Sequence, residues 1–264
     1  MSGKSSAMRA QTIFITGAAA GIGCETARLF HARGWQIGVY DVNARGVERL
    51  VAELGPGASG DVLDVTDAEA FAQALHHFAG HHGRLDVLLN NAGILSVGDF
   101  ESIDTVRHAL IVDINLKGVI NGCHAALPWL RHTPDSRVIN LASASAIYGT
   151  PGYASYSATK FAVRGLSEAL NIEWQRYDIR VFDLLPLFVN TAMVVPVRGN
   201  ASVRHLGVRL QASDVAATIW RAANSRRRRR VHWYVGMQSR LMALANKYVP
   251  DIVNRAIARA ISGY

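Results

Sequence analysis

A glycine-rich turn between an apolar run and a helical pattern most constrains the fold of this chain. Residues 11–16 (QTIFIT) are rich in β-branched side chains, and the turn GAAAGIG at residues 17–23 follows them directly. A helical pattern then runs from Glu25 to Ala32. A strand, a glycine turn and a helix in this order allow backbone N–H groups and a helix N-terminus to approach a pyrophosphate, because glycine has no Cβ to obstruct the ligand. A tight turn with a purely structural role is the alternative.

The rest of the chain continues this alternation of strand and helix patterns. Strands are predicted at residues 11–16, 36–40, 62–65, 85–89, 137–141, 181–185 and 231–235. Helices are predicted at residues 25–32, 43–54, from 67 onward, 103–131, 154–177 and 213–224. This order predicts an α/β fold, a single Rossmann-type doubly wound parallel sheet of about seven strands with helices on both faces. We interpret residues 1–264 as one domain, since single α/β units reach such lengths.

Three side chains between Ser143 and Lys160 form a candidate proton-transfer site. Tyr156 and Lys160 are four residues apart, so on the predicted helix they project from one face. Ser143 lies thirteen residues before Tyr156, just after the predicted strand 137–141, and would hold a substrate oxygen by a hydrogen bond. A phenol has a pKa of about 10, and a nearby ammonium lowers it toward the range of a general base. The alternative is an ordinary Tyr/Lys pair on a solvated helix.

Carboxylate and amide residues follow several predicted strands. Asp41 lies eighteen residues after Gly23, close to the roughly 20 expected of a carboxylate that binds an adenosine ribose. It would accept hydrogen bonds from both ribose hydroxyls and repel a 2′-phosphate, which favours NAD over NADP; capping the helix that begins near Asn43 is a compatible role. Asp64 is a candidate for the adenine ring edge. The small residues of Asn91-Ala92-Gly93 leave room for a ribose or a nicotinamide.

A buried amide and a group of histidines are further candidates. Asn115 stands among apolar neighbours in the predicted helix 103–131, where it would anchor a water chain to Lys160 or act as a satisfied core polar group. Four histidines have the i,i+4 spacing that suits metal ligation, namely His76, His77, His81 and His82. No third ligand lies near them in the sequence, so we predict no metal site.

The ordered set TGAAAGIG, NNAG, Ser143 and YSATK resembles the motifs of the short-chain dehydrogenase/reductase (SDR) family, in its ordinary-length branch, over nearly the whole chain. The resemblance implies that Tyr156 is the general acid/base and that Lys160 lowers its pKa and holds the nicotinamide ribose. It also implies that Ser143 orients the substrate and that Asn115 completes a proton relay. The cofactor site expected from the resemblance and the glycine turn comprises Gly17, Gly21, Ile22, Gly23, Asp41, Asp64, Val65, Asn91, Ala92, Gly93, Tyr156, Lys160, Pro186, Val189 and Thr191.

The resemblance also bears on assembly, and two positions of this chain can be compared with the family pattern. It implies a homodimer or homotetramer formed through the two long helices at residues 103–131 and 154–177. The chain reads Pro186-Leu187 after the sixth strand, where the family commonly has Pro-Gly. NADP-preferring members often carry a basic residue just before the second glycine of the turn, whereas this chain has Ala20, in agreement with Asp41.

Charge and cysteine content bear on partners and compartment. The net charge is +8, but five of the 28 basic residues form the run Arg226 to Arg230, so much of the excess is local. No stacking aromatics are interleaved within this run, which argues against nucleic-acid binding. The two cysteines, Cys24 and Cys123, give no disulfide framework and are interpreted as buried thiols. With no apolar signal pattern in the first ten residues, we predict a cytoplasmic protein.

Two C-terminal segments receive separate interpretations. Residues 191–212 contain an apolar stretch with no steady period and are predicted to form a substrate lid. The tail 239–264 contains an amphipathic pattern at residues 251–261. An amphipathic helix with an arginine run is compatible with peripheral contact with an anionic membrane. We favour instead a helix that packs against the protein's own core or a partner subunit.

These observations predict an NAD(H)-dependent oxidoreductase that interconverts a secondary alcohol and a ketone. The apolar lid residues Met193, Val194, Val195 and Val197 suggest a hydrophobic substrate such as a steroid, an acyl chain or a xenobiotic alcohol. The alternative is a catalytically idle dinucleotide sensor that controls a partner. Retention of Ser143, Tyr156 and Lys160 together argues against it, because a sensor needs no complete proton-transfer set.

Overall fold

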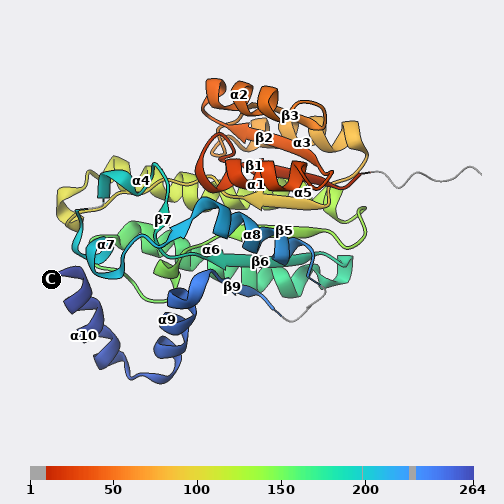
Figure 1. Ribbon diagram of the computed structural model, residues 1–264. Helices are drawn as coiled ribbons and strands as arrows, with labels where there is room; N and C mark the ends of the chain where they lie inside the picture. Colours follow the sequence, from red (N-terminus) through yellow and green to blue (C-terminus); the bar gives the residue numbers. More distant parts are fainter. Residues whose placement is uncertain (1–9, 198, 226–229) are drawn as a thin grey trace, which may run out of the picture.

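A seven-stranded parallel sheet forms the centre of the structure, a computed structural model that describes residues 10–197, 199–225 and 230–264 (Figure 1). The strand order is β3-β2-β1-β4-β5-β6-β9, and every neighbouring pair is parallel. The strands are β1 (Thr12–Thr16), β2 (Gln36–Asp41), β3 (Ala58–Val62), β4 (Val87–Asn90), β5 (Arg137–Leu141), β6 (Arg180–Leu185) and β9 (His232–Tyr234). The predicted fold class is therefore confirmed. Residues 1–9, which bore on the signal sequence, and Arg226 to Arg229 of the basic run lie outside the described residues.

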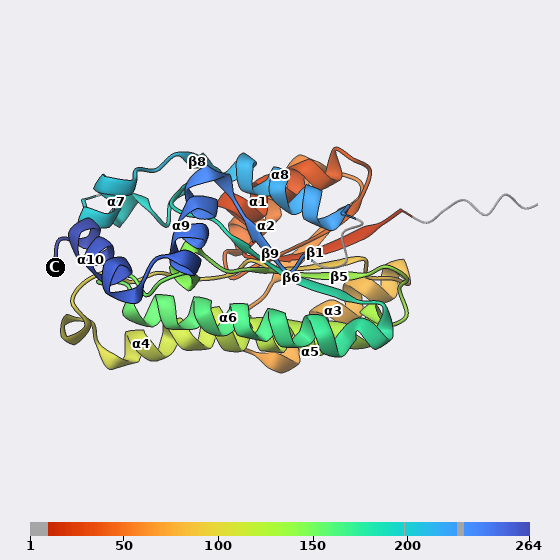
Figure 2. The same cartoon turned by 90° about the horizontal axis from the view of Figure 1, so that it is seen from below.

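Helices cover both faces of the sheet (Figure 2). Consecutive side chains of a strand point to opposite faces, so Ile13 and Ile15 of β1 pack on one side and Phe14 on the other. The first face carries α1 (Gly21–His31), α2 (Ala44–Leu54) and α8 (Ala212–Ala223), and the second carries α3 (Ala68–His82), α5 (Gly118–Leu130) and α6 (Ala154–Glu173). Cys24 and Cys123 are both buried free thiols, as predicted.

The third strand lies four residues earlier than predicted. The apolar run at residues 62–65 suggested a strand there, but the strand spans Ala58–Val62 and pairs with β2 from Ile37 to Asp41. Because β3 is the edge of the sheet, its residues need little apolar character, and all but the first are exposed. Gly60 is required in this register, since a Cβ there would lie 2.1 Å from the Val39 carbonyl oxygen.

The long helix predicted at residues 103–131 is interrupted by one wider turn. It consists of α4 (Thr105–Val112), a π-helical turn at Asp113–Lys117, and α5. The turn is defined by the Gly118 N–H, which donates to the carbonyl oxygen of Asp113 five residues earlier. Such turns are frequent at functional sites, and this one contains Asn115.

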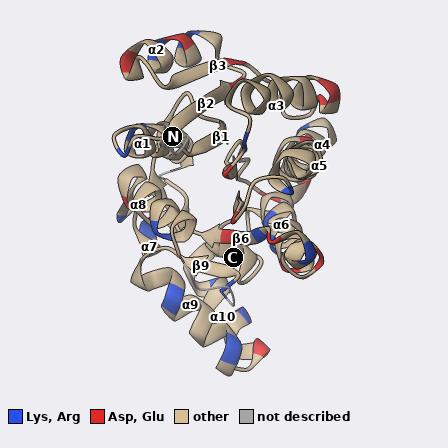
Figure 3. Cartoon of the chain, turned by 90° about the vertical axis from the view of Figure 1, so that its right-hand side faces the viewer, with Lys and Arg blue, Asp and Glu red and all other residues tan. Residues whose placement is uncertain are grey.

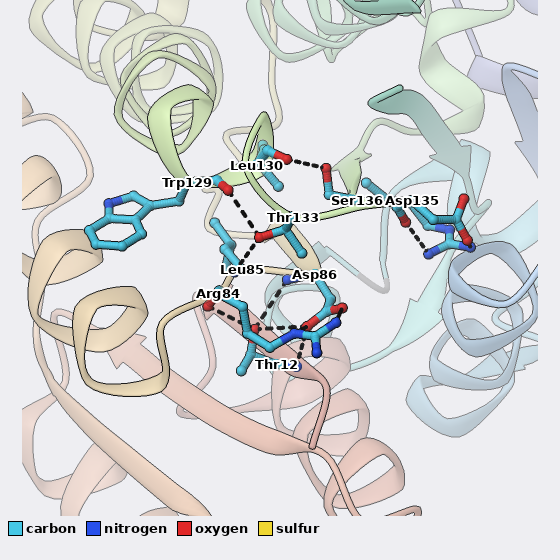
Figure 4. A network of polar contacts seen from close by, with 10 residues as sticks. Thr12, Arg84, Leu85, Asp86, Trp129, Leu130, Thr133, Asp135 and Ser136 are labelled. Carbon is cyan, nitrogen blue, oxygen red and sulfur yellow. Dashed lines mark hydrogen bonds and ion pairs between the residues drawn. The ribbon is translucent and has the colours of Figure 1, made fainter. Parts of the chain in front are cut away.

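A polar network stabilises the amino ends of the central strands (Figure 4). The backbone N–H of Thr12 donates to Asp86 Oδ2 at 2.8 Å, and Arg84 Nε donates to the same oxygen at 2.8 Å. The Thr133 hydroxyl accepts from the Leu85 N–H at 3.1 Å and thereby connects the start of β4 to the loop before β5. These polar groups are hydrogen-bonded to one another at the amino ends of the strands. Ligands bind at the other edge, beside the carboxyl ends, in folds of this type.

The C-terminal third adds elements beyond the main sheet (Figure 1). A two-stranded parallel sheet pairs β7 (Val189–Asn190) with β8 (Leu210–Gln211), and α7 (Ala201–Leu206) lies within the segment between them. The chain ends with α9 (Gly236–Tyr248) and α10 (Asp251–Ser262), which extend away from the sheet. Short 3-10 turns lie at Phe100–Ser102, Ala144–Ala146, Trp174–Tyr177 and Val195–Val197.

Candidate active site

A cavity of about 290 Å³ opens at the carboxyl edge of the sheet, beside the ends of β1, β4 and β5. Predicted site residues that line it are Gly17, Gly21, Ile22, Asp41, Asn91, Ala92, Gly93, Ser143, Tyr156, Lys160, Pro186, Val189 and Thr191. Four predicted residues do not line it: Gly23, Asp64, Val65 and Asn115. The sheet therefore gathers most of the predicted site from segments far apart in the sequence.

The glycine turn leaves space that any other residue would fill. Gly17 has φ of +65°, and a Cβ there would lie 2.8 Å from Ala92 Cα. A Cβ on Gly23 would lie 2.4 Å from the Gly17 carbonyl oxygen, so Gly23 is required for packing of the turn. Helix α1 begins without a side-chain cap and without an acidic residue in its first turn. Its unpaired N–H groups and the positive end of its dipole fit an anionic group such as a pyrophosphate.

Thr16 and Asn91 fix the glycine turn to the end of β4. The Thr16 hydroxyl accepts from the N–H groups of Asn91 and Ala92, both at 3.1 Å. The Asn91 side-chain amide donates to the carbonyl oxygens of Thr16 and Gly17, both at 2.9 Å. The sequence analysis did not single out Thr16, although its place at the end of a strand before the glycine turn was a usable signal.

Asp41 supports the glycine turn from β2. Its Oδ2 accepts from the Ala19 N–H at 3.0 Å and its Oδ1 accepts from the Asn43 N–H at 3.0 Å. The helix cap considered for Asp41 is instead provided by Asn43, whose side chain accepts from the Gly46 N–H. Asp41 lines the cavity, so its carboxylate remains placed to meet a ligand there.

Asp64 and Val65 lie outside the cavity lining. The Asp64 carboxylate accepts from the backbone N–H and the hydroxyl of Thr66, at 2.9 and 2.8 Å, and the side chain is exposed. Val65 is buried and its carbonyl oxygen accepts from the Asn121 side chain at 2.9 Å. The predicted contact of these two residues with an adenine ring therefore stays a prediction.

Ser143 and Tyr156 face the cavity from a strand end and a helix. Ser143 follows β5 and its hydroxyl accepts from the Ser145 N–H at 3.2 Å, while the Ala144 N–H donates to the Pro186 carbonyl oxygen. The lowering of the Tyr156 pKa by Lys160 stays a prediction. Burial raises the pKa of the phenol, and a hydrogen bond with Ser143 acts in the opposite direction. Tyr156 is consequently a neutral phenol, which suits it to donate a proton.

Lys160 lies one helical turn beyond Tyr156 and is 5% exposed. Its Nζ donates to the Leu141 carbonyl oxygen at 2.8 Å and lies 5.5 Å from the centre of the Tyr156 ring. Burial lowers the pKa of Lys160 to about 8, because the charged ammonium loses its hydration. The lysine thus titrates close to neutrality beside the cavity.

Asn115 bridges the π-helical turn to the segment after β4. It is fully buried, its Oδ1 accepts from the Ile94 N–H at 2.8 Å, and its Nδ2 donates to the Ile94 carbonyl oxygen at 2.9 Å. Its Oδ1 also lies close to Gly93, where a Cβ would be 3.1 Å away. Asn115 therefore supports the floor beneath Gly93 rather than lining the cavity.

Several cavity residues were not predicted. Tyr153 is 2% exposed, lines the cavity and has a hydroxyl without a hydrogen-bond partner among the described residues. Its position three residues before Tyr156 was a signal, since residues at this spacing are neighbours at a helix start. Leu187 and Phe188 also line the cavity, so the departure from Pro-Gly adds an apolar side chain to its wall. Leu206 and Met242 arrive from α7 and α9, and their sequence gave no signal for this role.

The described part of the chain shows neither a grouped set of metal ligands nor a membrane-spanning helix. No three or more His, Cys, Asp and Glu side chains are grouped as a metal ion requires, within residues 10–197, 199–225 and 230–264. Over the same part of the chain, no helix has the length and apolarity needed to span a bilayer.

The chain is similar to known proteins both in sequence and in fold. A family model described as short chain dehydrogenase matches residues 11–201. Oxidoreductase UcpA of Escherichia coli strain K12 is 34% identical over 187 residues, covering 69% of this chain and 71% of UcpA. A crystal structure of 3-ketoacyl-(acyl-carrier-protein) reductase from Brucella melitensis, complexed with NADH, shares 25% identity with a TM-score of 0.78 and covers 85% of this chain and 96% of that one. The structure of ElxO with NADP bound, at 24% identity and a TM-score of 0.78, covers 86% of this chain and 97% of its own and has the same fold.

Proposed function

This chain belongs to the short-chain dehydrogenase family, and on that premise we propose that it is an NAD(H)-dependent oxidoreductase that interconverts a secondary alcohol and a ketone. The observation that carries the proposal is the convergence of Ser143, Tyr156 and Lys160 on one cavity beside the glycine turn. A dinucleotide is supported by the uncapped start of α1 and by the glycine positions where a Cβ would collide with the turn. The NADH complex of the Brucella reductase is in agreement.

Each residue of the set has a defined task. The bound nicotinamide supplies or accepts the hydride. In the direction of ketone reduction, the neutral Tyr156 phenol donates its proton to the substrate oxygen, and the Ser143 hydroxyl donates a hydrogen bond to the same oxygen. In the direction of oxidation, Tyr156 accepts the carbinol proton. Because burial raises the pKa of Tyr156, the phenol that reduction requires prevails at neutral pH, and the phenolate that oxidation requires becomes more populated as the pH rises.

Lys160 and Asn115 act behind Tyr156. The Lys160 ammonium favours the phenolate that forms when the proton leaves, and its Nζ is oriented by the Leu141 carbonyl oxygen. Asn115 holds the Ile94 backbone, and with it the wall near Gly93, so we assign it a positioning role in the proton relay.

Preference for NAD over NADP rests on Asp41. Its carboxylate lines the cavity at the end of β2 and is bound by two backbone N–H groups. A negative charge there favours ribose hydroxyls as hydrogen-bond donors and repels a 2′-phosphate. Asp64, Val65, Val189 and Thr191 complete the proposed cofactor site.

The substrate that fits the cavity is apolar. The cavity lining includes the apolar side chains of Leu187, Phe188, Met193, Val194 and Met242 beside the small set of polar groups described above. We assign residues 191–212 the role of a substrate lid. Val106 on α4 and Ile172 on α6 are 75% and 72% exposed, which supports a homodimer or homotetramer formed through these helices.

A panel of secondary alcohols and ketones, followed by NADH absorbance and repeated with the NADP couple, tests the proposal. Turnover with NAD(H) on at least one apolar substrate is expected. The competing function, a dinucleotide sensor without catalysis, predicts NADH binding with no turnover of any compound in the panel. Such a result would reject the oxidoreductase.

A further inference from the structure

The two C-terminal helices expose apolar side chains along one stripe each. On α9 the stripe consists of Met237, Leu241, Leu244 and Tyr248, which recur at helical spacing and are 56–70% exposed. On α10 it consists of Ile252, Val253 and Ile257, which are 43–77% exposed. We call these seven residues the C-terminal apolar surface. The apolar face of α10 therefore does not pack against the protein's own core, and its packing against a partner subunit stays a prediction.

Polar contacts hold both helices in this orientation. The Gln238 side chain of α9 donates to the Leu206 carbonyl oxygen at 2.9 Å. The carbonyl oxygen of Ile261 in α10 lies 2.8 Å from His205 Nδ1, and the Tyr264 hydroxyl donates to the Asp99 carboxylate. Because the opposite sides of the helices are bound to α7 and to the segment before α4, the apolar stripes are held outward.

Lys and Arg residues lie on both α9 and α10 (Figure 3). Residues 236–264 contain Arg240, Lys247, Arg255 and Arg259 but only one acidic side chain, Asp251. At 100° per residue, Arg240 and Lys247 lie beside the stripe of α9 and Arg259 lies beside Ile252 on α10, whereas Arg255 lies on the opposite side of α10. An apolar stripe with flanking Lys and Arg is the arrangement that lies in the headgroup region of an anionic bilayer.

We propose that the C-terminal apolar surface docks on an anionic phospholipid bilayer. Pairing with a second copy of the chain fits the charges less well. In a symmetric pair the same patch meets itself, so Arg240, Lys247 and Arg259 of one copy would border the same three cations of the other with a single acidic residue on each side. Phospholipid headgroups supply the negative charge that this surface lacks.

The position of the helices relates the surface to the cavity. Met242 of α9 and Leu206 of α7 line the cavity, while Leu241 and Leu244 of α9 face outward. One helix therefore separates the docking surface from the site. Docking would bring the cavity next to the bilayer, where apolar alcohols and ketones concentrate. This last consequence rests on the proposed function, but the docking does not.

Sedimentation of the full-length chain with phosphatidylcholine vesicles, prepared with and without phosphatidylserine, tests the docking. Binding is expected only with phosphatidylserine and should weaken at high salt. The double variant Lys247→Gln/Arg259→Gln should bind about 25-fold more weakly, since each basic residue near such a surface contributes about fivefold. Leu244→Gln should weaken binding roughly tenfold or more.

Val62→Gln is the matched control, because Val62 is 53% exposed against 56% for Leu244 but lies on β3 at the far edge of the sheet. It should bind like the wild type. Absence of binding, or equal binding to both kinds of vesicle, overturns the proposal. So does a Leu244→Gln variant that binds vesicles normally but has a smaller mass by light scattering, since the surface then joins two copies. Sedimentation needs neither cofactor nor substrate, so its failure leaves the proposed reaction intact.

Discussion

Replacement of Tyr156 by phenylalanine separates proton transfer from binding. The change removes one hydroxyl whose interaction is with Ser143, so the free energy of unfolding should fall by only about 1 kcal/mol. Turnover should fall by about 10²–10⁴-fold, the usual contribution of a positioned acid or base. The full loss is expected because the neighbouring Lys160 Nζ is already bound to the Leu141 carbonyl oxygen and does not replace the phenol. Steady-state rates and an NADH fluorescence titration measure the two effects.

Tyr153→Phe is the matched control for this variant. It makes the same chemical change on the same cavity wall, but the Tyr153 hydroxyl has no hydrogen-bond partner among the described residues. Its turnover should stay of the same order as that of the wild type. Unchanged turnover in Tyr156→Phe would refute the reasoning, and so would a loss of NADH affinity as large as the loss of rate.

Three further predictions concern the supporting residues. Asp41→Ala should weaken NADH binding roughly tenfold or more, because hydrogen bonds to a charged group contribute about 1.5–3 kcal/mol. NADPH binding should improve in the same variant. Titration with each cofactor measures both effects, and an unchanged ratio of the two dissociation constants would contradict the role of Asp41. Asn115→Ala leaves the Ile94 N–H and carbonyl groups without partners, so it should lower the free energy of unfolding by about 2–4 kcal/mol. Urea titration measures this change. An unchanged free energy of unfolding would mean that water replaces the amide. Burial lowers the pKa of Lys160 from 10.5 to about 8, so the unfolded chain binds this proton more tightly than the folded chain. The free energy of unfolding of the wild type should therefore rise between pH 8 and pH 10.5 relative to that of Lys160→Met. Parallel curves of unfolding free energy against pH for the two proteins would contradict this.

The sequence was most informative where a motif depends on backbone geometry. The turn at residues 17–23 allows few alternatives, because a Cβ at Gly17 or Gly23 would collide with neighbouring backbone. The order of strand and helix patterns then determined the parallel sheet and which strand ends meet. The gathering of Ser143, Tyr156 and Lys160 at one cavity follows from that topology.

Features governed by the environment were harder to predict. The edge strand β3 carries mostly exposed residues, so hydrophobicity pointed to the neighbouring run at 62–65. The pKa of Tyr156 depends on how deeply the fold buries its phenol, and the sequence alone does not show that depth. Leu206 and Met242 reach the cavity from separate helices, and no local pattern connects them to it.

The short pairing of β7 with β8 has a consequence for how this site can diversify. Val189 lies opposite Leu210 and Asn190 opposite Gln211, so both ends of the intervening segment are fastened side by side. Lengthening a loop whose ends are already joined costs little extra closure entropy, because that cost grows only with the logarithm of its length. A different sequence at Ala192, Met193, Val194 and Leu206 can therefore reshape the cavity wall while the sheet and the proton-transfer residues keep their positions.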